Sequence, residues 1–437
     1  MITPAFPPYQ GSQTQRMLSI SNGLIAAGID VFVLTTEIMQ GHPSYNENTI
    51  KLVDPKIKIF RCNAGILHRK AYKKYTDCSM KKYGRTTEKA SKKQLISYKI
   101  YQILDRLKTF FLIPDTMIDW YFSTIRFIKK QKVFEGIRPD LILSCAMPNT
   151  CHIISFHLSK KYGIPMIMDY GDPWVYIANY NHGKIRFAFE KFIENRILLH
   201  ALFISFSTGG AERLYQEKFK LSPNKTMTVM TGFETQLLEK TKVYKTMKHD
   251  GIVLTYGGAI QTGIRDPSIF LKAFDNFTEC IMYFNMRTDN VPKLKALVNQ
   301  NITNNRVTVD SYLPFNQYYE EMLNSDILVF FGNSTTDQLP GKIFNYLPTG
   351  KLIFYISNVP YGGKDQAIDI VKDYGYYIVV QNEYEEIMKG LKMAVKKVKN
   401  YGSINYKKIE KYSTYNQMRL LANRIKELGR LIKCDEK

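Results

Sequence analysis

The sequence lacks the patterns that hold structural metals or that cross membranes. None of its six cysteines belongs to a CxxC pair, and no histidine lies at zinc-ligand spacing, which predicts a reduced compartment and no structural metal. The longest apolar runs, such as Ile197 to Phe206, fall far short of the roughly 20 residues that a membrane span needs. The N-terminus shows no basic-then-apolar signal segment. We therefore expect a cytoplasmic protein, either free or peripheral on the inner face of the cytoplasmic membrane.

Acidic residues are scarce relative to basic ones. The 437 residues include 39 Asp and Glu against 61 Lys and Arg, a formal net charge of +22. Such an excess points to anionic partners, which are nucleic acid, acidic lipid headgroups or phosphorylated substrates. Low-complexity tracts are also missing and 45% of the residues are hydrophobic, so we expect a folded chain. Its length predicts two domains of roughly 200 residues each.

Short apolar runs alternate with segments of helical period in the first half of the chain, which is typical of a parallel sheet wrapped by helices. The opening is a strand, a helix carrying Met17, Ile20 and Leu24 at helical spacing and ending at Gly28, and a second strand. The strands predicted in this half are Ile2 to Ala5, Val31 to Thr35, Ile57 to Cys62, Leu141 to Cys145, Pro165 to Asp169, Leu202 to Phe206 and Met227 to Met230.

The same alternation begins again in the second half of the chain. The strands predicted there are Ile252 to Tyr256, Cys280 to Phe284, Val307 to Val309, Ile327 to Phe331, Leu352 to Tyr355 and Tyr377 to Val380. The stretch 231–250 is polar and rich in lysine, which predicts a linker. We therefore expect an N-terminal domain over 1–231 and a C-terminal domain over 251–412. A terminal amphipathic helix over 413–437 would cross back towards the N-terminal domain.

A basic segment interrupts the first series over residues 66–138, and its apolar spacing after residue 96 predicts mostly helix. Ten basic residues lie between Arg69 and Lys93 against two acidic ones, with three tyrosines among them. A solvated charged face and an anionic membrane surface, with the tyrosines at its interface, are both compatible with this cluster. Nucleic acid is the third and least favoured partner, because no RNA or DNA module accompanies the charge.

Two glycine-containing loops follow predicted strands, where ligands of open α/β sheets bind. In "PAFPPYQGSQTQR", Gly11 permits close approach of the backbone to a ligand just before a helix begins. In "YGGAIQTGIRDP", Gly258 does the same and Arg265 offers a forked donor to an anion. The alternatives are a plain proline turn for the first loop and an ordinary strand-to-helix loop with a surface arginine for the second.

A third loop, "LPGKIFNYLPTGKLIFY", places Gly341 and Lys342 in the first turn of a short helix. A lysine there is electrostatically unfavourable unless an anion arrives, which predicts a diphosphate site. Asn345, one turn along, can bond a sugar hydroxyl, and Asp337 lies eight residues before it. The alternative is that Lys342 reaches into solvent.

These loops resemble those of the GT-B glycosyltransferases, specifically the retaining family-four group that uses nucleotide sugars in bacterial polysaccharide assembly, such as capsule and lipopolysaccharide. The resemblance covers nearly the whole chain, including "RPDLILSCAMPNTCHIISFHLSKKYGIPMIMDYGDPW" and "SDILVFFGNSTTDQLPGKIFNYLPTGKLIFY". It implies an α/β fold of two Rossmann-like domains facing across a cleft. The family's pair of glutamates, E-x7-E, is here Asp337 and Asn345. The family's first strand is also longer than the stretch before Pro7, so this strand is short or the chain start is misplaced.

The resemblance implies transfer of a sugar from a nucleoside-diphosphate sugar to a lipid-linked or glycan acceptor with retained configuration. Gly11, Gly258, Arg265, Gly341 and Lys342 would bind the donor diphosphate, without a metal or other cofactor. Asp337 and Asn345 would bind the nucleoside and sugar.

On the acceptor side, Asp172, with Asp169 as its alternative, and His152 would be the catalytic residues. For His152 a satisfied helix histidine is the competing interpretation, and Trp174 is either a packing residue or an acceptor platform.

Two other classes of function remain open from the sequence. An epimerase or phosphorylase would bind a nucleotide sugar or sugar phosphate on the same fold. A non-catalytic scaffold or nucleic-acid binder would use the fold and charge alone, and the two substituted glutamates keep that alternative open.

Overall fold

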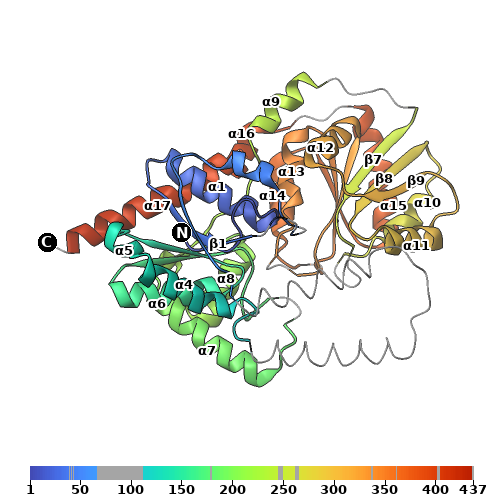
Figure 1. Ribbon diagram of the computed structural model, residues 1–437. Helices are drawn as coiled ribbons and strands as arrows, with labels where there is room; N and C mark the ends of the chain where they lie inside the picture. Colours follow the sequence, from blue (N-terminus) through green and yellow to red (C-terminus); the bar gives the residue numbers. More distant parts are fainter. Residues whose placement is uncertain are drawn as a thin grey trace. The chain divides into compact units, whose positions relative to one another are not determined.

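The computed structural model describes residues 1–38, 40, 42, 44–65, 112–177, 180–244, 250–260, 265–335, 338–360, 362–400 and 404–435. The chain divides into two compact units. The first contains Met1–Ser207, Glu212–Val229 and Met418–Lys437, and the second contains Thr208–Ala211 and Met230–Gln417. Each unit is built around its own parallel sheet (Figure 1).

The first unit follows the βα alternation that the sequence predicts. Its elements are α1 (Ser12–Ala26), β1 (Phe32–Thr36), η1 (Glu47–Leu52), β2 (Lys58–Cys62), α4 (Ile118–Lys130), α5 (Val133–Gly136), β3 (Ile142–Cys145), α6 (Thr150–Tyr162), β4 (Met166–Tyr170), α7 (Lys184–His200), β5 (Phe203–Phe206), α8 (Gly209–Phe219), η2 (Pro223–Lys225) and β6 (Thr226–Thr228). The strands pair as β1-β2 and as β3-β4-β5-β6, all parallel.

The predicted strand Ile2 to Ala5 is reduced to a single bridging residue. Ile2 pairs in parallel with Leu34 of β1 on one side and with Ser144 of β3 on the other. Pairing stops there because Pro4 has no backbone N–H to donate to a neighbouring strand. Ile2 therefore joins β2-β1 to β3-β4-β5-β6. From Ile2 the chain adds β1 and β2 on one side, and it then returns to add β3 to β6 on the other side.

Of the predicted basic segment over 66–138, the structure describes only residues 112–138, which contain α4 and α5. The cluster from Arg69 to Lys93 and the apolar stretch from Ile96 to Phe111 lie outside the described residues.

The second unit has six parallel strands in the order β12-β11-β10-β7-β8-β9. Its elements are α9 (Gln236–Val243), β7 (Ile252–Gly257), α10 (Ser268–Asp275), β8 (Met282–Thr288), α11 (Val291–Asn301), β9 (Val307–Ser311), α12 (Phe315–Asn324), β10 (Ile327–Phe331), α13 (Lys342–Tyr346), η3 (Leu347–Thr349), β11 (Leu352–Ser357), α14 (Gln366–Tyr374), β12 (Tyr377–Gln381), α15 (Tyr384–Lys399), α16 (Tyr406–Ile409) and η4 (Glu410–Tyr412). Numbered from β7, this is the 3-2-1-4-5-6 order of Rossmann sheets.

Helices cover both faces of the second sheet. Figure 1 shows α10, α11 and α15 on one face and α12, α13 and α14 on the other. The strands between them are buried on both faces, as in β10 and β11, where every residue is buried. This explains why they read in the sequence as continuous apolar runs rather than as alternating ones.

The predicted linker over 231–250 instead contains the helix α9. Leu237 and Leu238 of α9 pack against the core of the second unit, and the Thr241 hydroxyl lies 2.8 Å from the Tyr319 hydroxyl. The helix has only eight residues, and its two leucines are adjacent, so its sequence shows no helical period. The helix is stabilised by its contacts with the rest of the unit, so the sequence interpretation, which treated this stretch as a linker, missed the helix.

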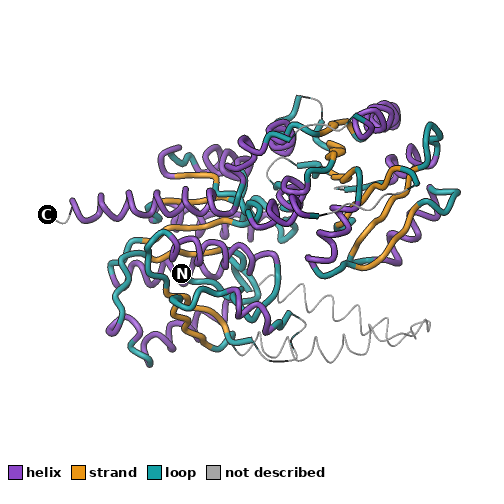
Figure 2. The backbone as a smooth tube through the Cα atoms, turned by 90° about the horizontal axis from the view of Figure 1, so that it is seen from above, coloured by secondary structure: helices purple, strands orange, loops and turns teal. Residues whose placement is uncertain are grey.

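The last helix, α17, spans Thr414–Asp435 (Figure 2). From Met418 on, the helix belongs to the first unit. Its side chains Met418, Leu421 and Ala422 are part of the core that contains Leu24 of α1. None of the described helices combines the length and the apolar character that crossing a membrane requires.

Candidate functional site

The carboxyl ends of β7 and β10 lie side by side where the strand order of the second unit reverses. From β7 the chain proceeds to β8 and β9 on one side, and it returns to β10 on the other. Ligands of open parallel sheets bind at such a reversal, beyond the strand ends. The loop with Gly258 leaves β7 at this point, and the segment that leads to Lys342 leaves β10.

Lys342 is the first residue of α13, and its ammonium points into the protein. The Nζ atom lies 5.0 Å from the centre of the Tyr256 ring. It also fills the space beside Gly258, where a Cβ would collide with it. The atom is buried and has no hydrogen-bond partner among the described residues. The alternative that Lys342 reaches into solvent is therefore wrong.

The surroundings of this ammonium lower its pKa. Burial first, and then the positive charge of Arg265, lower the pKa of Lys342, while the Asp289 carboxylate opposes both; the resulting pKa is about 7. The Nε atom of Arg265 is likewise buried without a partner among the described residues. Two cations lie close together, and no acid of the described residues is hydrogen-bonded to Lys342 Nζ or Arg265 Nε.

An unpartnered buried cation is costly, so a site that keeps one is expected to gain its partner from a ligand. Gly258 allows the ammonium and the backbone to lie together because it has no Cβ. The arrangement of Lys342, Arg265 and Gly258 can hold an anion with charge on several oxygens, such as a diphosphate. The sequence named all three residues, and the structure brings them together. The sequence interpretation did not name Tyr256, whose ring packs against the ammonium.

The remaining residues predicted on the donor side are placed less fully. Gly341 directly precedes α13 and is exposed, with open space where a Cβ would project. Asn345 lies on α13 and is half-buried. Asp337 lies outside the described residues.

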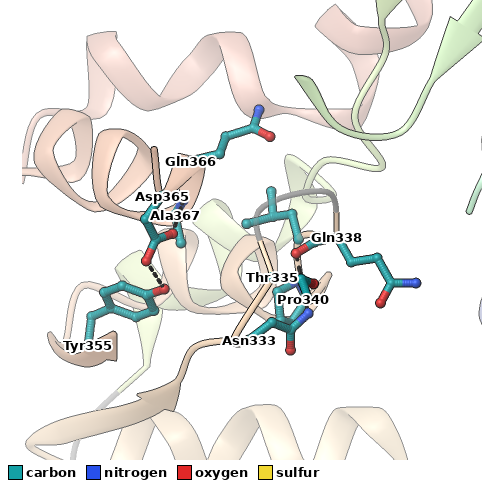
Figure 3. A pocket seen from close by; sticks show the side chains of 9 residues that line it. Asn333, Thr335, Gln338, Pro340, Tyr355, Asp365, Gln366 and Ala367 are labelled. Carbon is teal, nitrogen blue, oxygen red and sulfur yellow. Dashed lines mark hydrogen bonds between the residues drawn. The ribbon is translucent and has the colours of Figure 1, made fainter. Parts of the chain in front are cut away.

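A small pocket adjoins this segment in the second unit (Figure 3). Its polar lining includes Asn333 and Thr335 after β10, and Tyr355, Asp365 and Gln366 opposite them. The Tyr355 hydroxyl donates to Asp365 at 2.6 Å, and Asn333 donates to the Gln338 carbonyl at 3.2 Å. The Asn333 Oδ1 and Thr335 Oγ1 atoms are buried and have no partner within the described part of the chain. These oxygens can accept hydrogen bonds from hydroxyl or amide groups.

In the first unit, a buried ion pair joins α1 to the carboxyl end of β4. Arg16 donates to both carboxylate oxygens of Asp169, at 2.9 and 2.6 Å, and the Ser205 hydroxyl donates to the same carboxylate at 2.7 Å. Asp169 is therefore occupied in holding Arg16. The sequence carries only separate signals, an arginine within an amphipathic helix and an aspartate near the end of an apolar strand, and neither identifies the other as its partner.

Asp172 lies in the loop after β4 and is half-buried. The loop is fixed by two buried glutamates of α7. Glu190 accepts from the Trp174 indole N–H at 3.0 Å, and Glu194 accepts from the Val175 backbone at 3.3 Å and the Tyr215 hydroxyl at 2.7 Å. Trp174 is buried and hydrogen-bonded, which favours the packing interpretation for this residue.

His152, on α6, is completely buried, and its Nδ1 lies 2.6 Å from the Ser144 hydroxyl. Burial lowers its pKa to about 3, so the ring is neutral at physiological pH. An imidazole without solvent exposure has no surface on which to meet a substrate in this conformation. The geometry therefore favours a packed helix histidine over the catalytic interpretation, with Nδ1 bonded to Ser144 and Nε2 without a partner among the described residues.

Gly11 directly precedes α1 in the first unit, in extended backbone with a φ of 173°. A Cβ there would touch the Tyr9 ring at 3.4 Å, an ordinary packing distance. Gly258, Arg265, Gly341 and Lys342 all belong to the second unit. Among the residues that the structure describes, no group of three or more His, Cys, Asp or Glu side chains could hold a metal ion.

Comparison with known proteins gives the fold. No family model and no curated protein matches the sequence. Among solved structures, a glycosyltransferase from Rickettsia africae matches 98% of this chain and 97% of its own, with a TM-score of 0.59 and 11% identity. HepE from Anabaena, solved in complex with UDP-glucose, matches 98% of both chains, with a TM-score of 0.58 and 9% identity. The UDP-GlcNAc 2-epimerase of Neisseria meningitidis, bound to UDP-GlcNAc, matches 94% of this chain and 96% of its own, with a TM-score of 0.52 and 12% identity.

The chain has the GT-B fold. This agrees with the expectation of two Rossmann-like domains, and the likeness extends over nearly the full length of each neighbour. In terms of the GT-B fold, the cluster of Lys342, Arg265 and Gly258 belongs to the C-terminal Rossmann-like unit, and Asp172 belongs to the N-terminal one.

Proposed function

We propose that this GT-B protein is a glycosyltransferase that moves a sugar from a nucleoside-diphosphate sugar to a glycan or lipid-linked acceptor, with retained configuration. The observation that carries the proposal is the buried ammonium of Lys342, unpartnered within the described chain, beside Arg265 and Gly258. The UDP-glucose and UDP-GlcNAc bound to two structural neighbours support a nucleotide sugar as the donor.

The chemistry of transfer explains why two cations would be kept here. When the bond between the anomeric carbon and the diphosphate breaks, negative charge grows on the departing diphosphate. Lys342 and Arg265 would stabilise that charge more strongly in a dry site than in water. They would take the role of a metal ion, so we expect no metal requirement. Gly11 and Gly341 would add backbone N–H groups.

On the acceptor side, we assign Asp172 as the base or the sugar-hydroxyl partner. It lies in a loop that the buried acids Glu190 and Glu194 hold in place, which is the support a positioned catalytic group needs. Asn345, and Asp337 beyond the described residues, would contact the nucleoside or sugar.

The described part of the basic segment supports an anionic partner. A groove of about 480 Å³ lies where this segment meets the end of α6. Its lining comprises the cations Lys129, Lys132, Arg138 and Lys161, one acid, Glu135, and the apolar or aromatic residues Ile128, Phe134, Tyr162 and Ile164. An acidic glycan or an anionic membrane surface fits this charge, and either agrees with a cytoplasmic, peripheral protein.

A nucleotide-sugar epimerase is the second candidate, because one structural neighbour carries that name. Both functions would use the same diphosphate site and differ in the fate of the sugar. Product analysis therefore separates them, whereas nucleotide binding does not.

The test is a panel of UDP, GDP and ADP sugars, read first by thermal shift and then by mass spectrometry with lipid-linked and glycan acceptors. We expect one nucleotide class to raise the melting temperature and its sugar to appear on an acceptor. Sugar converted to its epimer without transfer would favour the second candidate. If no nucleotide sugar raises the melting temperature, the result would favour the alternative of a non-catalytic scaffold or nucleic-acid binder.

A further inference from the structure

The polarity of α7 is opposite to that of an ordinary surface helix. Its charged residues Arg186, Glu190 and Glu194 are buried, with 3%, 1% and 0% of their surface exposed. Arg186 donates to Glu190 and to the carbonyls of Leu112 and Pro114, so these two charges are paired. Glu194 instead accepts hydrogen bonds from the Tyr170 and Tyr215 hydroxyls and from the Val175 backbone.

The opposite side of α7 exposes large apolar side chains. We call Ile185, Phe189, Phe192 and Leu199 the apolar stripe of α7, and they are 82%, 52%, 59% and 63% exposed. Their spacing of four, three and seven residues places them along one side of the helix. The helix lies at the outside of its unit (Figure 1). Single exposed apolar residues are normal on a protein surface, but a continuous stripe of them marks an interaction surface.

The charges beside the stripe are of one sign. Lys184 and Arg196 are exposed, and the Arg196 guanidinium lies 5.8 Å from the centre of the Phe192 ring. Both carboxylates of α7 are buried on its other side, so the charged side chains that the helix exposes to solvent are all cations. At the C-terminal end of α7, burial of the ring lowers the pKa of His200. The nearby positive charges of Lys160 and Lys225 lower this pKa as well.

We propose that the apolar stripe of α7 lies in the headgroup region of an anionic membrane, with the flanking cations on the lipid phosphates. Apolar side chains bordered by Lys and Arg are the composition of helices that lie in such an interface. A second copy of the chain fits less well, because the same cations would meet across the contact. Nucleic acid would meet the charges but leave the four apolar side chains in water.

The reverse side of the same helix holds the acceptor-side loop. Glu190 and Glu194 bond Trp174 and Val175, which follow Asp172 within three residues. A helix seated on the membrane would therefore keep this loop close to lipid-borne substrates. This step rests on the proposed function and names its acceptor as lipid-linked, whereas membrane binding by α7 does not depend on it.

The experiment is vesicle flotation of the full chain with the double variant Phe189→Ser/Phe192→Ser. We expect the unaltered protein to float with vesicles that contain phosphatidylglycerol and to remain below with phosphatidylcholine alone. Removing two half-exposed rings should lower the partition coefficient at least about tenfold. The matched control is Ile50→Ser/Leu52→Ser, which removes two exposed apolar side chains beside a lysine on η1 and should float as before.

A second variant measures insertion directly. In Phe189→Trp, lipids brominated on their acyl chains should quench the new indole, while the two native tryptophans, Trp120 and Trp174, are buried and serve as the unquenched background. Unaltered flotation of the double serine variant, or absence of quenching in Phe189→Trp, would overturn the proposal. So would a stable dimer in light scattering that the serine variant converts to monomer, because the stripe would then be a contact between copies.

Nucleotide-sugar stabilisation is measured on the same proteins without vesicles. We expect the double serine variant to keep it in full, because none of the donor-site residues lies on α7. Flotation without any nucleotide binding would refute the proposed function and leave the membrane surface standing. Nucleotide binding without flotation would refute the membrane surface and leave the proposed function standing.

Discussion

At the scale of single residues, Lys342 shows the conflict between stability and ligand binding that marks a functional group. Its ammonium is buried beside a second cation and opposed only in part by Asp289. Replacing it with methionine keeps the aliphatic length and removes the charge.

Lys342→Met should therefore raise the free energy of unfolding by about 1–3 kcal/mol while abolishing stabilisation by nucleotide sugars. Denaturant unfolding and thermal shift measure the two effects. Lys351→Met is the matched control, since Lys351 is also half-buried but directly precedes β11, at the amino end of the strands. It should leave nucleotide binding intact. A Lys342→Met protein that still binds a nucleotide sugar would contradict the site.

The pKa of Lys342 predicts how affinity depends on pH. In the free protein this pKa is about 7, below the ordinary value of 10.5, and a bound diphosphate would raise it. Binding then takes up a proton above pH 7, so affinity is highest below pH 7 and falls as the pH rises, by up to about tenfold per pH unit. Calorimetry of a nucleotide sugar in two buffers of different ionisation enthalpy measures both the affinity and the proton uptake. Lys342→Arg, charged throughout this range, should bind without the pH dependence. Equal affinities across the range in the unaltered protein would refute the assignment.

The same shift affects stability with a definite sign. Between about pH 7 and 10.5 the unfolded chain holds the Lys342 proton and the folded chain does not. Stability of the ligand-free protein should therefore rise with pH across this window for this group.

Single residues also show what the sequence could predict about the site. Lys342 was predictable because the reason for its role is local, a cation at the start of a helix that follows a buried strand. Arg16 was not, because its partner Asp169 lies 153 residues away along the chain and only the fold brings the two together.

At the scale of elements, the loop after β7 depends on Gly258 having no side chain. The backbone of Gly258 is not in the left-handed region, so alanine fits its conformation, but the added Cβ would occupy the position of Lys342 Nζ. Gly258→Ala should displace the flexible end of the lysine and press against the buried Tyr256 hydroxyl. It should therefore weaken nucleotide-sugar binding at least about tenfold and lower the free energy of unfolding by about 1–3 kcal/mol.

The control for this substitution is Gly429→Ala in α17, where nothing lies within 4 Å of the added Cβ. It should stabilise the helix by about 0.5–1 kcal/mol and leave binding unchanged. Thermal shift with and without the nucleotide sugar reads both variants. Normal binding by Gly258→Ala would show that the ammonium does not act from its place beside this glycine.

The elements differ in how well their sequence predicts them. The strand Ile327–Phe331 was predicted to the residue because a fully buried strand reads as an unbroken apolar run. α9 and the inverted polarity of α7 were missed, because both depend on partners elsewhere in the chain. Glu190 and Glu194 look like surface residues until the loop that they hold is known.

At the scale of the whole molecule, α17 matters because its residues are divided between the two units. The helix begins in the second unit at Thr414, and from Met418 on it supplies side chains to the core of the first. Leu420 and Leu421 are adjacent on this helix, with 47% and 0% of their surface exposed. Their sequence neighbourhood is the same, so the pair isolates the effect of burial.

Leu421→Ala should lower the free energy of unfolding by about 2–5 kcal/mol, because it leaves a cavity in a packed core. Leu420→Ala should change it by less than about 1 kcal/mol. Denaturant unfolding followed by far-UV circular dichroism compares the two. The loss should fall on the transition of the first unit, and nucleotide-sugar stabilisation should persist where the second unit is still folded. Equal losses in both variants would mean that the terminal helix does not pack through the face that carries Leu421.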